Sequence, residues 1–202
     1  DSINKDVLLR NAKVNNGNIV LPGGAVYKVL VIPGKRRMSP NANAMSFQVF
    51  EKIVNLIKQG ATVIIAEFPN KSAGLYNHKI YDKKLAKLVH EINNIDVQGI
   101  SNSKFGKIFF RQIGKGKLIE GKYTSESLEV LDIDRDFYAF DFDGNMERNI
   151  AWNHRKSKYF DIYFNSNQLN ENRIVNISLN TALISVSKYR WNFYFEIRIV
   201  SF

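Results

Sequence analysis

The stretch that decides the fold reads YKVLVIPGKRRMSPNANAMSFQVFEKIVNLIKQGATVII and covers residues 27–65. It begins with an apolar run, Tyr27–Ile32, which is followed by a polar loop and then by a helix predicted from Ser46 to Lys58. A second apolar run, Ala61–Ala66, comes directly after Gly60. Two short apolar strands joined by a crossover helix are typical of a parallel βαβ unit whose sheet is covered on both faces. Such a unit usually places a ligand site beyond the carboxyl ends of its strands, but the residues there form no recognisable catalytic set.

The predicted crossover helix has clear ends and one apolar face. Ser46 is a favoured N-cap residue, and Gly60 suits the position just after the last turn. Spacings of three and four residues place five large apolar side chains on one side, which predicts that this side covers a sheet. These side chains are Phe47, Phe50, Ile53, Val54 and Ile57.

The rest of the first half reads as short strands and one more helix. Asn15–Asn18 contains an Asn-Gly turn between apolar runs, which indicates a hairpin or a helical turn followed by a strand. Further elements are predicted from local periodicity and turn residues. They are a helix over Asp82–Ile92, a strand over Phe105–Ile113, a turn at Gly114–Gly116 and a short helix over Thr124–Leu131.

The pattern of apolar and polar residues changes near residue 134. The helical period disappears, and short strand candidates follow one another between turn signals, which is typical of an antiparallel β module. The candidates are Phe137–Phe142, Asn149–His154, Phe160–Phe164, Arg173–Leu179, Leu183–Ser187 and Trp191–Val200. We therefore predict two domains, an α/β domain over residues 1–133 and a β-sandwich module, complete or incomplete, over residues 134–202.

Composition narrows the classes of function. The chain has no cysteine, which excludes disulfides, thiolate catalysis and cysteine-ligated zinc. Its apolar runs fall far short of the roughly 18 residues that a membrane-spanning helix needs. Residues 1–133 hold 20 Lys/Arg against 11 Asp/Glu, a net charge of +9, whereas residues 134–202 hold 9 against 8, a net charge of +1. A basic half could bind nucleic acid, but Lys35–Arg37 forms a tight cluster without interleaved aromatic residues, so solvated lysines are the favoured interpretation.

Several polar groups invite a catalytic interpretation, and each has a simpler one. Gly114–Lys117 lacks the glycine spacing of a phosphate-binding loop and leads into a strand, which indicates a tight turn. His78, His90 and His154 show no metal-ligand spacing. Five aspartates lie close together in sequence and could act as the carboxylate pair of a glycosidase. Their places in a linker and a turn favour local backbone bonding instead. These aspartates are Asp132, Asp134, Asp136, Asp141 and Asp143. We predict no catalytic residue, no metal site and no cofactor.

The aromatic residues of the second half leave one alternative open. Trp152 and Trp191 could form stacking platforms for sugar rings, because an exposed ring face is a rigid apolar surface with polar edges. The core of a β-sandwich uses the same residue types, and a core position is the favoured interpretation.

Several short segments, spread in order over about residues 1–179, resemble segments of a known family. They are Asp1–Asn4, Leu8–Leu9, Ile19–Pro22, Tyr27–Pro33, Met45–Ser46, Phe50–Ile53, Gly60–Ile64, Pro69–Ser72, Gly114–Ile119, Gly121–Lys122, Trp152–Arg155, Asp161–Phe164 and Asn167. Together they resemble a region of the family 106 glycoside hydrolases, the α-L-rhamnosidase-like enzymes. Trp152–Arg155 and Asp161–Phe164 resemble the family's Trp-x-His-Arg and Asp-Ile-Tyr-Phe element. The loop at Lys35–Ala44 looks longer than in the family, and its Trp-Asp-Pro segment is not found after Leu179.

The resemblance carries expectations about fold and role. It implies a glutamine-amidotransferase-like or flavodoxin-like parallel sheet with flanking helices, followed by β-sandwich modules, in a region that comes after the catalytic barrel. The catalytic carboxylates belong to that barrel, so none is carried over to this chain. We expect a non-catalytic accessory or scaffold region of a carbohydrate-degrading hydrolase. Its partners would be the catalytic domain of the parent enzyme and a plant or host polysaccharide, and the location would be periplasmic or secreted. The alternatives are a carbohydrate-binding module and, with less support, a nucleic-acid binder.

Overall fold

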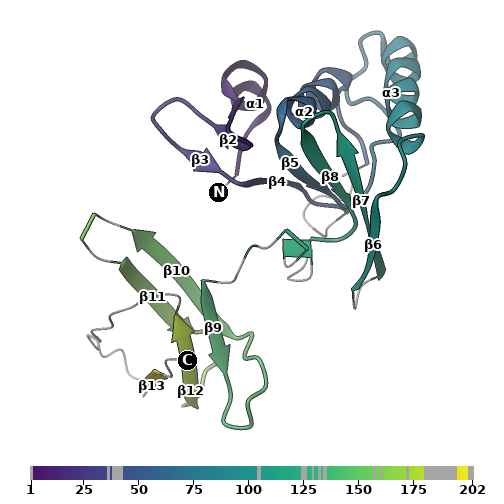
Figure 1. The fold of residues 1–202 in the computed structure, drawn as a ribbon. Helices are drawn as coiled ribbons and strands as arrows, with labels where there is room; N and C mark the ends of the chain where they lie inside the picture. The colour runs from purple at the N-terminus through teal and green to yellow at the C-terminus, as the bar shows by residue number, and fades with distance from the viewer. Residues whose placement is uncertain are drawn as a thin grey trace. The chain divides into compact units, whose positions relative to one another are not determined.

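The structure is a computed structural model of the 202-residue chain. It describes residues 2–35, 37, 43–103, 106–123, 127–128, 130–131, 133, 136–156, 158–159, 161–171, 173–179 and 195–199. The chain forms two compact units, residues 1–133 and residues 134–202, and each is described by itself (Figure 1).

The first unit opens with a small N-terminal subdomain. Helix α1 (Lys5–Asn11) leads into a three-stranded sheet of β1 (Lys13–Asn15), β2 (Asn18–Val20) and β3 (Val26–Tyr27), in that order. Asn16 and Gly17 both have positive φ angles, 47° and 79°, as a two-residue type I′ hairpin turn requires. The predicted Asn-Gly turn is therefore confirmed, and the residues before it form both a helix, α1, and a short strand, β1. Leu8, Ala12 and Ile19 join the subdomain to the main core of the unit.

The main sheet of the first unit is mixed rather than parallel throughout. Its order is β4 (Val29–Ile32), β5 (Thr62–Ile65), β8 (Gly116–Glu120), β7 (Gly106–Ile113) and β6 (Gly99–Ser103). The pairs β4–β5 and β5–β8 are parallel, which confirms the predicted βαβ unit, while β8–β7 and β7–β6 are antiparallel. The expected single strand Tyr27–Ile32 is divided, because Tyr27 pairs with Ile19 in the small sheet and Val29 pairs with Thr62 in the large one.

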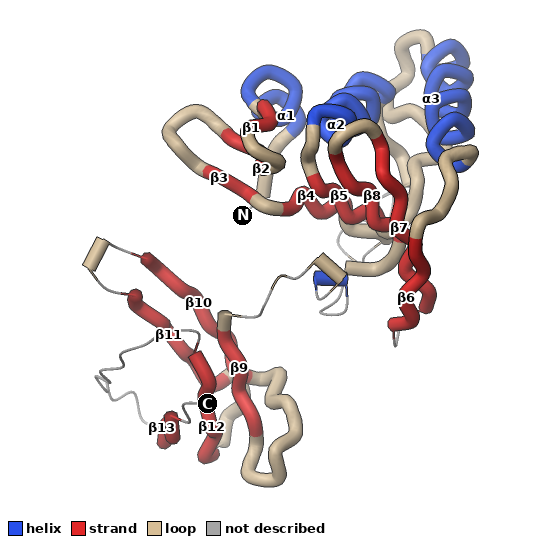
Figure 2. The backbone as a smooth tube through the Cα atoms, viewed as in Figure 1, coloured by secondary structure: helices blue, strands red, loops and turns tan. Residues whose placement is uncertain are grey.

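Two helices cover one face of this sheet. Helix α2 (Phe47–Gln59) begins at the residue after Ser46 as predicted, and α3 (His78–Asn93) begins four residues before the expected start at Asp82. Both lie on the same side (Figure 2). Five residues of α2 are buried, and each aliphatic side chain so removed from water contributes about 1.5–3 kcal/mol. They are Phe50, Ile53, Val54, Leu56 and Ile57.

The opposite face of the sheet has a separate core, and no long helix among the described residues packs against it. Ile64, Ile108 and Ile119 are buried there, and Leu128 and Leu131 pack against them. Leu128 and Leu131 come from the segment in which a short helix was predicted over Thr124–Leu131, part of which lies outside the described residues. The expected flavodoxin-like arrangement, a parallel sheet between flanking helices, therefore differs from the described sheet in strand direction and in the placement of its helices.

The described residues of the second unit form two small sheets that share a core. One holds β10 (Ile150–Lys156) and β11 (Asp161–Asn167), and the other has the order β13 (Phe195–Ile199), β12 (Arg173–Leu179) and β9 (Phe137–Phe140). Buried side chains from both sheets meet in one cluster, namely Phe137, Ala139, Ile150, Val175 and Ile177.

The expectation of a purely antiparallel module is wrong for one strand pair. β12 and β9 are antiparallel, but β12 and β13 run parallel. The sequence pattern of alternating strands and turns did not distinguish a parallel neighbour from an antiparallel one. The strand predicted over Leu183–Ser187 and the residue Trp191 lie outside the described residues.

Candidate functional site

The most concentrated polar cluster lies on the β10–β11 hairpin of the second unit. In the register of this pair, His154 stands opposite Tyr163 and Lys156 stands opposite Asp161. Because side chains alternate between the two faces of a strand, these four residues project from the same face. Asp136, the residue before β9, meets them from the other sheet through its hydrogen bonds to His154 and Tyr163. Sequence reasoning considered His154 and Asp136 separately and did not bring them together.

His154 stands at the centre of this cluster. Its Nδ1 atom lies 2.5 Å from Oδ2 of Asp136, and its Nε2 atom lies 3.0 Å from Oδ1 of Asp161. The imidazole ring stacks on the ring of Tyr163, with centroids 4.2 Å apart and planes inclined by 8°. Each ring nitrogen thus faces a carboxylate oxygen, and one ring face is covered.

Tyr163 completes the cluster as a hydrogen-bond donor. Its hydroxyl donates to Oδ1 of Asp136 over 2.7 Å, so both oxygens of that carboxylate are engaged. Burial raises the pKa of Tyr163 well above its usual value of 10.0, and the hydrogen bond to Asp136 and the charges of Asp136 and Asp161 raise it further. Tyr163 is therefore held as the neutral phenol. The polar atoms satisfy one another, which is the pattern of a cluster that fixes a packing arrangement.

The aspartates considered as a carboxylate pair do not converge on one point among the described residues. Asp136 binds His154, whereas Asp141 accepts hydrogen bonds from the backbone and side-chain nitrogens of Asn145, 2.8 and 3.1 Å away. The side-chain hydrogen bond from Asn145 lowers the pKa of Asp141, and the backbone bond from the same residue lowers it further. Asp143 lies exposed in the same turn, and Asp132 and Asp134 lie outside the described residues.

The other two histidines belong to helix α3 in the first unit. Nδ1 of His78 lies 3.2 Å from the carbonyl oxygen of Leu75, and Nε2 of His90 accepts a hydrogen bond from the amide of Asn94 over 3.1 Å. Within the part of the chain that the structure describes, no three His, Asp or Glu residues are grouped as a metal site would require. The metal site that the histidines could have suggested therefore has no counterpart in the described residues.

Trp152, one of the two candidate sugar platforms, lies at the rim of the core. The residue is 45% exposed, and its ring stacks on that of buried Phe137 with centroids 5.1 Å apart. Asn165 stands opposite Trp152 in the register, and its side-chain oxygen is buried without a hydrogen-bond partner among the described residues. Trp152 is thus partly exposed, and its ring packs against the core through Phe137. The second candidate, Trp191, falls in a segment that is not described.

The Gly114–Lys117 segment is the tight turn that the sequence favoured. It joins β7 to β8, and Gly114 has a positive φ angle of 60°. The backbone N–H groups of Lys115 and Lys117 donate to the carbonyl oxygens of Lys58 and Ala61, each over 3.1 Å. The turn therefore satisfies the carbonyl group of Lys58 in the last turn of α2, where a helix leaves its last acceptors unpaired, and that of Ala61 directly before β5.

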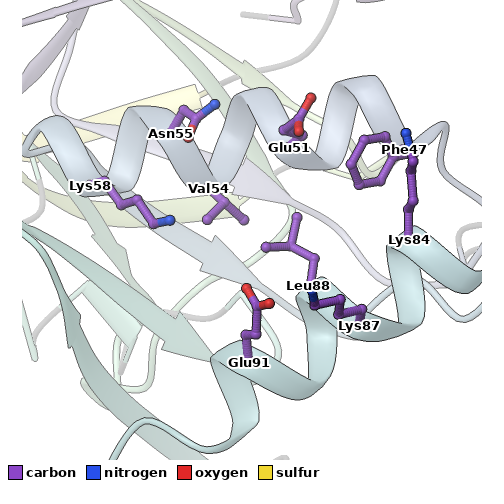
Figure 3. A pocket seen from close by; sticks show the side chains of 9 residues that line it. All are labelled: Phe47, Glu51, Val54, Asn55, Lys58, Lys84, Lys87, Leu88 and Glu91. Atoms are coloured by element: carbon purple, nitrogen blue, oxygen red, sulfur yellow. The ribbon is translucent and has the colours of Figure 1, made fainter.

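A groove of about 350 Å³ runs between α2 and α3 (Figure 3). Val54 and Leu88 point toward one another across it, and Lys84 lies beside Phe47 at one end, with its Nζ atom 5.6 Å from the ring centroid. The remaining lining residues are polar and of both signs of charge, namely Glu51, Asn55, Lys58, Lys87 and Glu91. Sequence reasoning missed this groove, because it considered only the apolar faces of the two helices and not the charged positions beside them.

Among the described residues, no helix is both long enough and apolar enough to cross a membrane.

Comparison with known proteins assigns the chain to a family. The family model for alpha-L-rhamnosidase, glycoside hydrolase family 106, matches residues 1–183. A putative beta-glucuronidase of Formosa agariphila is 27% identical over 174 residues, which cover 84% of this chain and 12% of that protein. The structure of a rhamnosidase from Novosphingobium sp. PP1Y matches with a TM-score of 0.64 at 21% identity, over 87% of this chain and 15% of that one.

These matches establish the family and the relative size of the chain. The likeness to the solved structure extends to the fold, and the chain spans less than a sixth of the length of either protein. Since the family model covers most of the sequence, this chain belongs to the alpha-L-rhamnosidase family, glycoside hydrolase family 106.

Proposed function

We propose that this chain is a non-catalytic accessory or scaffold region of a carbohydrate-degrading glycoside hydrolase. The observation that carries the proposal is the small share of each relative that the chain covers, 12% of the putative beta-glucuronidase and 15% of the rhamnosidase. A glycosidase needs two carboxylates on either side of the scissile bond. Most of each relative lies outside the matched region and is available to supply them.

The chemistry of the second unit supports the same role. A catalytic acid or base needs a free proton-transfer partner directed toward the substrate. His154 instead directs its ring nitrogens to Asp136 and Asp161, and Asp136 uses its second oxygen for Tyr163. We infer that this cluster serves packing rather than turnover.

The organisation we propose follows from these points. Residues 1–133 form an α/β domain, a divergent form of the amidotransferase-like or flavodoxin-like fold, and residues 134–202 form a β-sandwich module. The domain acts mechanically, by bracing or presenting the catalytic domain of its parent. The parent would act on a polysaccharide outside the cytoplasm, in the periplasm or after secretion.

The test is turnover by the chain alone. Purified residues 1–202 are incubated with an aryl α-L-rhamnoside and, in parallel, with an aryl β-glucuronide, because relatives carry both names. The proposal expects no release of the aryl alcohol above the buffer blank. Turnover that follows the protein through purification would overthrow it.

A second candidate function, a carbohydrate-binding module, is favoured by one observation. Trp152 is 45% exposed, and its ring stacks on the ring of Phe137. A sugar ring stacked on Trp152 would change its fluorescence. The test is a titration with rhamnose-containing oligosaccharides on the wild-type chain and on Trp152→Ala. A saturable change that is lost in the variant would favour this candidate, and no change in the wild type would leave the scaffold role.

A further inference from the structure

We propose that His154 is a proton-dependent latch, whose doubly protonated ring joins the two sheets of the second unit through Asp136 and Asp161. Asp136 directly precedes β9 in one sheet, and Asp161 is the first residue of β11 in the other. The bridge therefore connects the chain at its entry into β9 with the β10–β11 hairpin. It is independent of the proposed accessory function, because it depends only on contacts within the unit.

The number of hydrogen-bond donors that the ring needs follows from the groups that face its two nitrogens. An ionised carboxylate only accepts hydrogen bonds, so a ring nitrogen that faces one must carry a hydrogen. Nδ1 faces Asp136 at 2.5 Å, and Nε2 faces Asp161 at 3.0 Å. A neutral imidazole carries one N–H, whereas the imidazolium carries two. Both contacts are satisfied together, with both carboxylates ionised, only when His154 holds the second proton.

The groups around the ring favour the positive charge. Asp136 approaches from the segment before β9 and Asp161 from β11, so two carboxylates face the ring. Tyr163, also on β11, is a neutral donor to Asp136. Among the described residues, Lys156 is the one further cation in contact with this cluster. Its side chain is exposed, and its Nζ atom lies 3.8 Å from Oδ1 of Asp161. Hydrogen bonds between charged partners are roughly twice as strong as neutral ones.

The consequence is a link between proton binding and the packing of the two sheets. When the ring loses its second proton, one nitrogen presents a lone pair to a carboxylate, and that contact changes from attractive to repulsive. The ring remains stacked on Tyr163, but the tie to either Asp136 or Asp161 is lost. We expect the second unit to become less stable at mildly alkaline pH for this reason.

The first experiment observes the protons directly. Imidazole nitrogen–proton correlation spectra are recorded on the isotope-labelled full chain at about pH 7, within the range where histidines exchange their second proton. His154→Phe identifies the His154 signals by their absence. We expect both ring nitrogens of His154 to show the chemical shifts of protonated nitrogens. An unprotonated ring nitrogen at this pH would overturn the proposal.

The second experiment measures the link to stability. Both tryptophans lie in residues 134–202, so tryptophan fluorescence reports the unfolding of this unit. For the wild type, we expect the unfolding temperature to fall by about 5 °C or more between about pH 7 and about pH 9.5, a range below that in which tyrosine ionises. His154→Phe keeps a planar ring that can stack on Tyr163, but this ring has no hydrogen-bond donors. The variant should therefore have a lower unfolding temperature than the wild type at about pH 7, and that temperature should depend much less on pH.

A matched control separates the latch from general effects of pH. His90→Phe changes a histidine of the first unit whose recorded side-chain hydrogen bond is to Asn94, and it should keep the wild-type pH dependence of tryptophan fluorescence. Equal pH dependence in the wild type and in a folded His154→Phe chain would overturn the latch. If His154→Phe does not fold, the spectra of the wild type decide the question, with Asp161→Asn used for assignment.

Discussion

Gly116 lies so close beneath the end of helix α2 that a Cβ atom at this position would overlap the carbonyl oxygen of Ile57. The same atom would also overlap the carbonyl oxygen of Ala61. The β7–β8 turn can reach these carbonyl groups because its backbone carries no side chain there. The glycines that resemble part of a phosphate-binding loop thus allow close contact between a turn and the end of a helix.

The first prediction concerns this contact. Gly116→Ala should destabilise the first unit by about 3 kcal/mol or more, because two backbone segments must move apart to admit one methyl group. Gly99→Ala is the matched control, since a Cβ there meets nothing within 4 Å. Chemical unfolding followed by far-ultraviolet circular dichroism reports the first unit, which holds helices α1, α2 and α3. A Gly116→Ala chain as stable as Gly99→Ala would contradict the described contact.

The second prediction compares the two helix N-caps. Asn4 caps α1, with its side-chain oxygen accepting from the N–H of Val7 over 2.9 Å. Ser46 occupies the same position before α2, but its side chain makes no capping hydrogen bond and its hydroxyl oxygen is buried without a recorded partner. Asn4→Ala should cost about 1 kcal/mol, whereas Ser46→Ala should change the free energy of unfolding by less than about 0.5 kcal/mol. If Ser46→Ala also lowered the free energy of unfolding by about 1 kcal/mol, the side chain of Ser46 would have to form a capping hydrogen bond in solution.

The third prediction concerns Tyr163. Its pKa in the folded unit is raised above the usual 10.0, chiefly by burial and then by Asp136, so the folded chain holds the phenolic proton more tightly than the unfolded chain does. This contribution to stability is fully present below about pH 10 and is lost as the pH rises through the folded pKa. The difference in phenolate absorbance between the wild type and Tyr163→Phe should therefore develop above the ordinary tyrosine range. A difference titration centred near pH 10 would refute the described environment.

Much of the fold could be predicted from local patterns, because burial imposes a period on the sequence. Helix α2, the parallel β4–β5 pair and the Asn16–Gly17 turn were all predicted. The break between β3 and β4 was not predicted, because Tyr27 and Val29 belong to one largely apolar stretch and differ in their strand partners. Strand β6 was missed because Gly99–Ser103 is an edge strand with mostly polar residues, which leaves no period to read.

The candidate cluster could not be predicted, because it depends on register and on a contact between sheets. The alternation in Trp152–Lys156 and Asp161–Asn165 indicates which side chains share a face. It does not show that four residues connect the strands so that His154 stands opposite Tyr163. Asp136 lies 18 residues before His154, in a segment that reads as a linker. A search for a His and a Tyr that stand opposite each other in a short hairpin could have found His154 and Tyr163, but not Asp136.

The measurement that tests the accessory role most directly is the hydrolysis assay on the full 202-residue chain. A rhamnosidase that contains its catalytic barrel, assayed under the same conditions, sets the scale of turnover, and Asp136→Asn tests a carboxylate of the candidate cluster. The account predicts that the wild-type chain and Asp136→Asn release no aryl alcohol above the blank while the complete enzyme does. Turnover by the wild type that Asp136→Asn abolishes would contradict it and would make the second unit a catalytic domain.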